Sequence, residues 1–516
     1  MKTFDEMGTL FTRRRFLGAV AATGAVAGCR TFSLAGGDRP LLRIGVVSDV
    51  HIRFAKDGDV LEEGFGTETF EKSLEYFRDN GVDAVVLAGD MADYGRIGEL
   101  KALADAWYRV FPDDRAPDGR KVERIFTFGN HDAYGRKRGD VAVAAREFIE
   151  TDPRRAWDEC FHEEWKPFFT KSVKGFDFFV AHWSPGVWCN GYSEAACAGC
   201  RDAFSAPMAK CDPSRPFFYV QHPHPRETVY GKCAWGADDG SATELLSRFP
   251  NAVAFSGHSH EPLTNELSIW RGAFTSVATG TLRHLGASDV WSLARQAGYE
   301  NGKCNIHLPG LKREDRPFYY AKYDAPKMMP DEARRYDVRI GQLVNVYEDR
   351  IEFYRREFAS GIDIGEPWIV EFPARPRSFA VRAKEARPAQ FPSGAALSAK
   401  VSTAMTRGLK MSGRDEIPSV EQPALKLAFP AATEGGVVVE YEIAASNAAG
   451  ERWDTRICAV GGLYPRRHEM FARPVSATVP LAALPKGASS VEVTPLDSFG
   501  NRGRPLTASI AGRNEG

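Results

Sequence analysis

The sequence has no excess charge of either sign, and beyond its N-terminal segment it has no long apolar run. Lys and Arg together number 67 and Asp and Glu 68, which leaves a formal net charge of −1. This balance gives no electrostatic reason to expect nucleic acid as the main partner. No stretch after the N-terminal segment is long and apolar enough to form a membrane-spanning helix. The chain also shows no internal repeat and no low-complexity tract.

What is present is the composition of a soluble globular protein, with 43% apolar and 26% charged residues. At 516 residues the chain is too long for one ordinary core, so we expect two folded domains. Arg, Ala and Pro dominate at residues 373–394, where we predict a linker. The linker separates an N-terminal domain, 41–372, from a C-terminal domain, 395–516, whose short strand-like runs predict a fibronectin-III-like β-sandwich.

The N-terminus has the features of an export signal. Thr12-Arg13-Arg14-Arg15-Phe16-Leu17 is typical of the twin-arginine route, and the run from Gly18 to Gly28 is too short to span a bilayer. Cys29, preceded by Val-Ala-Gly, resembles the lipidated cysteine of bacterial lipoproteins. We therefore expect residues 1–29 to be a signal and 30–40 a linker. The predicted location is the periplasm or cell envelope, with a membrane anchor at Cys29 as a further expectation.

A short apolar run from Ala84 to Ala88 predicts a buried parallel strand, and Asp90 follows its carboxyl end. In open α/β sheets ligands bind at that edge. The run from Leu41 to Val47 repeats the pattern and leads to Asp49 and His51. A helix predicted over Glu68–Asn80 would join the two strands into a right-handed βαβ unit. Asp49 and Asp90 would then meet at one edge, where a carboxylate can bridge two cations.

Three further predicted strands end in possible metal ligands. Val122–Phe128 leads to Gly129-Asn130-His131-Asp132, and Pro216–Val220 leads to His222, which is nearer the strand end than the alternative ligand His224. Ala252–Phe255 leads to Gly257-His258-Ser259-His260. Beyond them, four runs predict strands of a second sheet: Phe274–Ala278, Gln342–Val346, Arg350–Tyr354 and Trp368–Phe372. Glu348-Asp349 is predicted to be a hairpin turn between two of these strands.

Five of the nine cysteines crowd one segment: Cys189, Cys197, Cys200, Cys211 and Cys233. Disulfides, free buried thiols and a structural zinc all remain open there. We expect most of Val141–Cys211, apart from a strand at Phe176–His182, to be an insertion over the ligand-bearing edge. The cysteine-rich part, about 183–235, is predicted to be an insertion that shapes access to the ligand-bearing edge.

The ordered motifs are Asp49-x-His51, Gly89-Asp90, Gly129-Asn130-His131-Asp132, His222 and Gly257-His258-x-His260. This set resembles the calcineurin-like metallophosphoesterase superfamily, whose motifs run D-x-H, G-D, G-N-H-D/E, H and G-H-x-H. The resemblance extends over about Leu41 to Phe372. It implies a four-layer α/β/β/α sandwich that holds two metal ions.

The resemblance also implies roles for single residues. The first ion would be bound by Asp49, His51, Asp90 and His260. The second would be bound by Asp90, Asn130, His222 and His258. His131 would be the catalytic residue beside them, and Asp93 matches an acidic position often seen in the second motif. Purple acid phosphatases have an iron-binding Tyr at that position, but Tyr94 comes one residue later, which disfavours that subgroup.

The donor chemistry agrees with the resemblance. Oxygen and imidazole ligands without thiolate suit Zn, Mn, Fe or Co. Two such ions roughly 3.5 to 4 Å apart can hold a hydroxide and bind phosphate oxygens for in-line attack. His131, left unbound, can donate a proton to the leaving alkoxide, and we expect Asp132 to orient it. The prediction is a dinuclear metal-dependent hydrolase of small phosphate esters, with phosphodiesters favoured over phosphomonoesters.

Two alternatives remain at this point. A metal-dependent nuclease would use the same chemistry, but the neutral chain lacks the basic stripe that binds a phosphate backbone. A non-catalytic binding protein on the same fold is expected to lack some ligands, and none is missing. The sequence does not indicate the oligomeric state, the substrate or which metal is bound.

Overall fold

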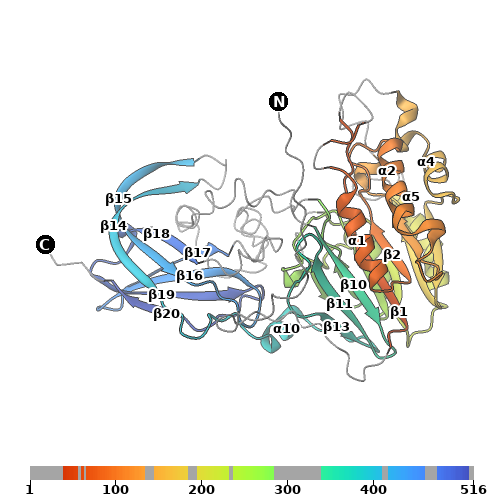
Figure 1. Cartoon of the computed structure of the whole chain (residues 1–516). Helices are drawn as coiled ribbons and strands as arrows, with labels where there is room; N and C mark the ends of the chain where they lie inside the picture. Colours follow the sequence, from red (N-terminus) through yellow and green to blue (C-terminus); the bar gives the residue numbers. More distant parts are fainter. Residues whose placement is uncertain are drawn as a thin grey trace, which may run out of the picture. The chain divides into compact units, whose positions relative to one another are not determined.

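The computed structural model describes residues 39–55, 60–62, 65–133, 144–183, 194–231, 236–283, 339–409, 416–459 and 474–510. The chain divides into two compact units, Met1–Arg39 and Pro40–Gly516. The predicted signal at 1–29, its Cys29 and nearly all of the predicted linker at 30–40 lie outside the described residues. The fold below is that of the second unit (Figure 1).

The first sheet contains the predicted strand before Asp49 and the one before Asp90. Its order is β12-β11-β10-β1-β2-β3, with β13 also paired to β11. The strands are β1 (Leu42–Val47), β2 (Ala84–Ala88), β3 (Glu123–Thr127), β10 (Ile340–Val346), β11 (Arg350–Glu357), β12 (Ile362–Asp363) and β13 (Trp368–Glu371). β1, β2 and β3 are parallel, so their carboxyl ends share one edge. β10 pairs antiparallel with β1.

The second sheet has the order β4-β5-β6-β7-β9-β8. Its strands are β4 (Phe168–Val173), β5 (Phe176–Ala181), β6 (Phe217–Val220), β7 (Ala252–Ser256), β8 (Ile269–Arg271) and β9 (Thr275–Ala278). β5, β6, β7 and β9 are parallel, and the two edge strands β4 and β8 are antiparallel to their neighbours. The carboxyl ends of β6 and β7 therefore also share an edge.

The grouping of the strands into sheets differs from the prediction. The four runs after residue 273 do not form one sheet: β9 pairs with β7, whereas β10, β11 and β13 join β1. Apolar strands look alike in sequence, and only hydrogen bonding across the molecule decides which sheet each one joins. The segment after residue 144, most of which is predicted to be an insertion, contains helix α4 (Pro153–Phe161) and edge strand β4 besides the predicted strand. The predicted hairpin at Glu348-Asp349 is present between β10 and β11.

Alternating side chains build the layers. In β2, Val86 faces the core between the sheets while Val85 and Leu87 join the outer core, and in β6 Phe218 and Tyr219 divide in the same way. The rings of Phe255 and Phe353 meet across the two sheets, 6.3 Å apart.

Helices cover both outer faces (Figure 1). The helices described before residue 283 are α1 (Glu68–Asp79), α2 (Ile97–Val110), α3 (Asn130–Ala133), α4, α5 (Glu194–Met208) and α6 (Ser241–Leu246), of which the short α3 carries Asn130 and His131. The face of α1 formed by Phe70, Leu74 and Phe77 packs under the first sheet, as its spacing predicts. Phe204 of α5 contacts Tyr219 of the second sheet, with ring centroids 6.1 Å apart. The predicted four-layer α/β/β/α sandwich is confirmed.

The C-terminal region consists of two antiparallel sheets, of order β14-β15-β18 and β17-β16-β19-β20. The strands are β14 (Ser398–Leu409), β15 (Glu416–Phe429), β16 (Val438–Asn447), β17 (Arg452–Cys458), β18 (Val475–Pro480), β19 (Ala488–Asp497) and β20 (Leu506–Ser509). The predicted all-β class is confirmed, and likeness to fibronectin III stays a prediction. A short helix, α10 (Phe379–Glu385), lies within the predicted linker 373–394.

Two of the crowded cysteines can be followed in the described residues. Cys200 lies 3.4 Å from the hydroxyl of Tyr219, and Cys211 contacts the carboxylate of Asp177. Neither is in a disulfide. Cys189 and Cys233 fall outside the described residues, so the alternatives for them stay as predicted. Among the described residues, no helix combines the length and the apolar character needed to cross a membrane.

Candidate metal centre

The loops that follow β1, β2, β3, β6 and β7 converge, so the two sheets contribute to one site. The loops after β1 and β2 run side by side, with the N–H of Asp49 donating to the carbonyl of Gly89 and that of His51 to the carbonyl of Asp90. The N–H of His258, from the second sheet, donates to both carboxylate oxygens of Asp49 at 3.2 Å. Ligands separated by more than two hundred residues are therefore neighbours.

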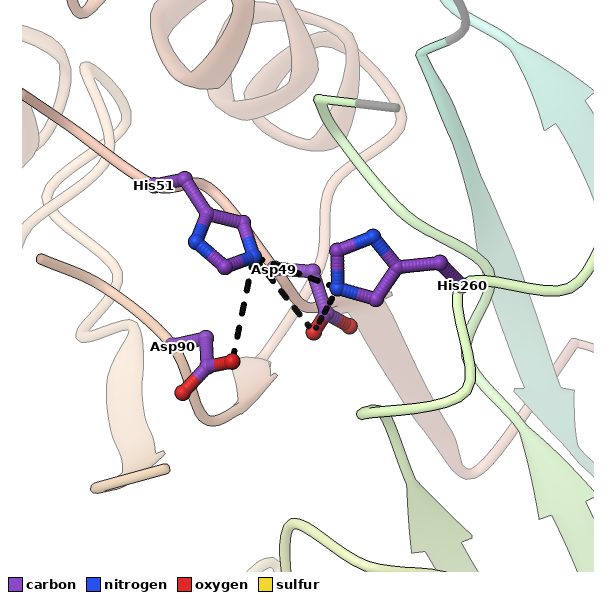
Figure 2. Close-up of side chains that lie close together, drawn as sticks. All are labelled: Asp49, His51, Asp90 and His260. Atoms are coloured by element: carbon purple, nitrogen blue, oxygen red, sulfur yellow. Dashed lines mark hydrogen bonds and ion pairs between the residues drawn. The ribbon is translucent and has the colours of Figure 1, made fainter. Parts of the chain in front are cut away.

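The first group of possible ligands is Asp49, His51, Asp90 and His260, whose donor atoms all lie within 4.8 Å of one another. Figure 2 shows the two imidazoles and two carboxylates pointing toward a common centre. The Nε2 of His260 is 2.9 Å from Oδ1 of Asp49, and the Nε2 of His51 is 3.8 Å from Oδ2 of Asp90. This is the set predicted for the first ion.

The second group is Asp90, His222 and His258, which meet the same distance limit. A third group that meets it, His51, Asp93 and His131, shares His51 with the first. The Nε2 of His222 lies 3.1 Å from Oδ2 of Asp90 and 3.1 Å from the amide oxygen of Asn130. The set predicted for the second ion is thus assembled as well. Asp90 belongs to both the first and the second group, which is the position of a bridging carboxylate.

Glycines make this crowding feasible at three points. A Cβ on Gly89 would overlap the ring of His222, and a Cβ on Gly129 would overlap the carboxylate of Asp90. A Cβ on Gly257 would come within 2.6 Å of Oδ2 of Asp49. Each glycine of the motifs G-D, G-N-H-D and G-H-x-H therefore lets its backbone pass against a ligand from another motif.

The backbone of the ligands is unusual. Asp49, His51, Asp90, His258 and His260 have φ angles of 54°, 49°, 53°, 69° and 54°. Positive φ costs a non-glycine residue on the order of 1–3 kcal/mol and tends to gather at functional sites. The sharp turns it produces aim side chains two residues apart, such as His258 and His260, into the same space.

Neighbouring groups fix the orientation of two ligand imidazoles. The Nδ1 of His222 lies 2.7 Å from the carbonyl oxygen of Ala88, so it donates its hydrogen there and Nε2 is the nitrogen that faces Asp90 and Asn130. The Nδ1 of His51 is 3.0 Å from Oδ1 of Asp93, which leaves its Nε2 facing Asp49 and Asp90. A carbonyl or carboxylate behind a histidine is the usual arrangement around a protein-bound metal.

The protonation states suit cations. Burial lowers the pKa of His51 to about 4, helped by nearby His131. Burial also lowers the pKa of His258. Both rings are therefore neutral at pH 7, as metal ligands must be. Burial alone would raise the pKa of Asp90, but the adjacent His222 and His131 outweigh it and hold that pKa well below its usual value.

His222 behaves in the opposite way. Burial lowers its pKa, but the neighbouring carboxylate of Asp90 outweighs burial and raises it to about 9. The cluster of carboxylates therefore attracts positive charge to this position. A cation bound between Asp90 and His222 would supply that charge in place of the proton.

His131 lies beside both groups. Its backbone N–H donates to Oδ1 of Asp90 at 2.8 Å. The ring nitrogen Nδ1 is 2.9 Å from the carbonyl oxygen of Asp93 and 3.1 Å from Oδ1 of the same residue. With 16% of its side chain exposed, it is more open than the ligand Asp90, at 1%. His131 is thus oriented by Asp93 and can be reached by a substrate.

Asp132 differs from the prediction that it orients His131. Its carboxylate accepts hydrogen bonds from the N–H groups of Gly129 (2.7 Å), Ala92 (2.8 Å) and Met91 (3.3 Å). Burial, with repulsion from Asp90, raises its pKa to about 7. Asp132 therefore joins the loop after β3 to the loop after β2, and Asp93 is the carboxylate at the His131 ring. Sequence spacing suggested the adjacent residue because it cannot show that the β2 loop passes behind His131.

The less favoured ligand, His224, is buried and packs against Tyr230, with ring centroids 5.8 Å apart. It is absent from the groups of possible metal ligands found among the described residues. Tyr94, one residue after Asp93, lies against the guanidinium of Arg53. Neither residue alters the donor set given above.

The donor set fits two divalent or trivalent ions. It consists of carboxylate and amide oxygens and imidazole nitrogens, with a carboxylate placed to bridge, and no cysteine joins any group found in the described residues. Such ligands suit Zn, Mn, Fe or Co. The identity of the metals is not fixed by these residues.

Comparison with known proteins gives the same family. Residues 42–262 match the family described as calcineurin-like phosphoesterase. None of the curated proteins compared matches the chain. Among solved structures, a purple acid phosphatase from yellow lupin (Lupinus luteus) seeds shares 11% identity at a TM-score of 0.35, covering 64% of this chain and 53% of its own. This chain thus spans about half the length of that protein.

A conserved uncharacterized protein from Streptococcus pneumoniae TIGR4, named as a predicted phosphoesterase, shares 11% identity at a TM-score of 0.25. The likeness covers 64% of this chain and 97% of that one. Neither solved structure is close enough to assign an activity. Residues 42–262 are therefore similar to the calcineurin-like phosphoesterase family, and the converging Asp and His side chains agree with that similarity.

Proposed function

We propose that the protein hydrolyses phosphate esters with two bound metal ions. The observation that carries this proposal is the position of Asp90, which belongs to both the first and the second group of possible ligands. A shared carboxylate holds two cations close enough to act on one phosphate. His131, which belongs to neither of these two groups, lies beside the same carboxylate.

The residues divide the chemistry among them. The two ions, when bound, would supply a hydroxide at neutral pH and neutralise charge on the phosphate. His131 donates a proton to the leaving oxygen, a role worth roughly 10²- to 10⁴-fold in rate. Asp93 holds the ring through its Nδ1, so the proton to be transferred is carried on Nε2. Asp132 and the three glycines, Gly89, Gly129 and Gly257, allow the loops of the site to pack closely against one another.

Phosphodiesters are the favoured substrates, ahead of phosphomonoesters, and a nuclease is the second candidate. The test is turnover of bis(p-nitrophenyl) phosphate, p-nitrophenyl phosphate and single-stranded DNA, together with metal analysis, for wild type and Asp90→Asn. Asp118→Asn, an exposed carboxylate outside the site, is the control. In wild type and the control we expect diester cleavage and two bound ions per chain. In Asp90→Asn we expect loss of the cleavage and of the bound ions.

Other outcomes of this test would contradict parts of the proposal. Faster cleavage of the monoester would reverse the substrate order, and cleavage of DNA above both esters would favour the nuclease. Two bound ions without turnover of any of the three would favour a non-catalytic binding protein.

The location is a separate proposal: export by the twin-arginine route and anchoring through Cys29. It is supported by Thr12–Leu17 and the Val-Ala-Gly-Cys sequence ending at Cys29. Fractionation of cells that express the full chain tests it. Arg13→Lys with Arg14→Lys should keep the protein in the cytoplasm, and Cys29→Ala should release it from the membrane fraction. An unchanged distribution in either variant would contradict the corresponding step.

A further inference from the structure

Arg53, two residues after the ligand His51, is held at the edge of the site. Its Nε donates to Oδ2 of Asp93 at 2.6 Å, and its guanidinium lies 3.7 Å from the centre of the Phe65 ring. The ring of Tyr94 is also near, 5.4 Å from the guanidinium carbon. The side chain is therefore fixed by one carboxylate and by aromatic surface before any substrate arrives.

The outer edge of this guanidinium is open. In the described part of the chain, neither terminal amino group of Arg53 donates a hydrogen bond, and Glu62 comes no closer than 3.6 Å to Nη1. The side chain is 23% exposed, so these amino groups can be reached from outside. Arginine presents planar N–H pairs that match phosphate and carboxylate oxygens, and here one pair is left for another acceptor.

The position of Arg53 relative to His131 indicates which part of a substrate the open edge of the guanidinium would contact. One carboxylate, Asp93, holds both side chains: Oδ2 binds Arg53 and Oδ1 lies 3.1 Å from Nδ1 of His131. The proposed function places the leaving group of the substrate at His131. Arg53 therefore stands on the leaving-group side, where a fixed positive charge favours an anion.

A purely structural ion pair is the competing explanation. Oδ1 of Asp93 is bound by two imidazoles, His51 and His131, and Oδ2 is bound by Nε of Arg53 alone, so the ion pair uses only one of the three nitrogens of the guanidinium. An ion pair that served stability alone would also gain little from a partly exposed position. An arginine with a second, unused hydrogen-bonding edge beside the proton donor fits substrate binding better.

We propose that Arg53 binds an oxyanion of the substrate on the leaving-group side of the site. The oxyanion is either a non-bridging oxygen of the scissile phosphate or a second anionic group carried by the leaving group. This inference rests on the proposed function and names a specificity-determining residue for it.

The test uses the metal-loaded full chain as wild type, Arg53→Gln, Arg53→Lys and a matched control, Arg356→Gln. The side chain of Arg356 is similarly exposed, at 21%, and pairs with the carboxylate of Asp363 at 2.7 Å. Its guanidinium lies 4.4 Å from the centre of the Tyr76 ring, but the residue is on β11. Binding of inorganic phosphate is measured by calorimetry. Kinetics are measured with diphenyl phosphate and bis(4-carboxyphenyl) phosphate, whose leaving groups differ by one carboxylate.

Loss of a charged hydrogen bond predicts roughly a 10- to 100-fold weaker interaction for Arg53→Gln. If the anion is an oxygen of the scissile phosphate, phosphate affinity and kcat/KM for both esters fall together. If it is a second group on the leaving group, only the carboxylated ester is affected, mainly through KM. Arg53→Lys keeps the charge without the planar donors and should recover part of the loss.

The proposal is wrong if Arg53→Gln stays within twofold of Arg356→Gln for phosphate and for both esters while it retains its metal. If Arg53→Gln loses metal, Arg53→Lys with full metal content takes its place in the comparison. The proposal is then wrong if Arg53→Lys stays within twofold of Arg356→Gln for phosphate and for both esters. Absence of turnover in wild type, with phosphate binding that still depends on Arg53, would refute the proposed hydrolysis and leave the anion site standing. Absence of both would refute both.

Discussion

The Nδ1 atom of His222 lies 2.7 Å from the carbonyl oxygen of Ala88, so the last residue of β2 in the first sheet orients a ligand that follows β6 in the second. This contact passes over Gly89, where a side chain would overlap the imidazole. The two sheets are thus joined at the ligands themselves. Disturbing one sheet's loop is expected to disturb a ligand carried by the other.

The closest test of this dependence is Gly129→Ala. A Cβ at Gly129 would overlap the carboxylate of Asp90, so we expect loss of at least one bound metal ion per chain and loss of turnover. Metal analysis of the purified protein measures this. Gly199→Ala on α5 is the control, because its Cβ would meet only an ordinary contact at 3.6 Å and alanine favours helices by about 1 kcal/mol. Full metal content in Gly129→Ala would contradict the crowding described above.

His131→Ala should slow catalysis and leave the metals in place. Removing a general acid costs roughly 10²- to 10⁴-fold in kcat, and the loss should be larger for an alkyl ester than for a p-nitrophenyl ester because nitrophenolate leaves without a proton. Steady-state kinetics with both ester types measure the difference. Equal losses for the two leaving groups would argue against proton donation by His131.

Asp93→Asn should weaken both metal binding and catalysis, since one carboxylate contacts His51 and His131. Loss of a group behind a metal-binding histidine typically costs roughly 10- to 100-fold in metal affinity. Competition with a chelator measures that affinity. Asp83→Asn is the control: this buried carboxylate pairs with Lys174 at 2.7 Å, and it precedes β2 rather than following it. Equal metal affinities in the two variants would show that Asp93 does not support His51.

Glu99 should impose a pH dependence on stability. Its buried carboxylate accepts hydrogen bonds from the N–H groups of Phe54, Tyr94 and Arg96, yet burial raises its pKa to about 7 from 4.5. Between these values the folded protein holds a proton that the unfolded chain has lost. Its contribution to the free energy of unfolding is therefore complete below pH 4.5 and declines by up to about 1.4 kcal/mol per pH unit as the pH rises toward 7.

Glu99→Gln removes this proton and should flatten the decline. Urea denaturation of wild type and Glu99→Gln at several pH values from 4.5 to 8 measures the two slopes. The difference between the proteins should change with pH up to about 7 and then stay constant. Parallel curves over the whole range would show that the carboxyl titrates near its ordinary pKa.

The helix in the predicted linker should contribute to stability. Arg382 of α10 bonds to the carboxylate of Glu266 at 3.2 Å and to the carbonyls of Glu266 and Ile269. Arg382→Met leaves these buried acceptors one donor short, which should lower the free energy of unfolding by about 1–3 kcal/mol in urea denaturation. Arg377→Met, in a more exposed pair, should change it by less than about 1 kcal/mol. Equal effects would mean that α10 is held no more firmly than a surface loop.

Much of the fold and of the ligand set was predictable from sequence because both depend on local patterns. Apolar runs gave β1, β2, β6 and β7, and helical spacing gave α1, whose observed end at Asp79 is one residue from the predicted one. The polar residues at the strand ends gave the candidate ligands, because the carboxyl ends of parallel strands must face the same way. Residues such as Asp90 were identifiable by position alone.

Only the tertiary structure decided which elements meet. It assigned β9 and β10 to different sheets, because strand pairing depends on hydrogen-bond partners far along the chain. In the tertiary structure the His131 ring contacts Asp93, and the Asp132 carboxylate accepts hydrogen bonds from three backbone N–H groups instead. Arg53 donates a hydrogen bond to the same Asp93. Sequence determines which side chains stand at each strand end, whereas the paths of the loops, set by glycine contacts and positive φ angles, determine which of them touch.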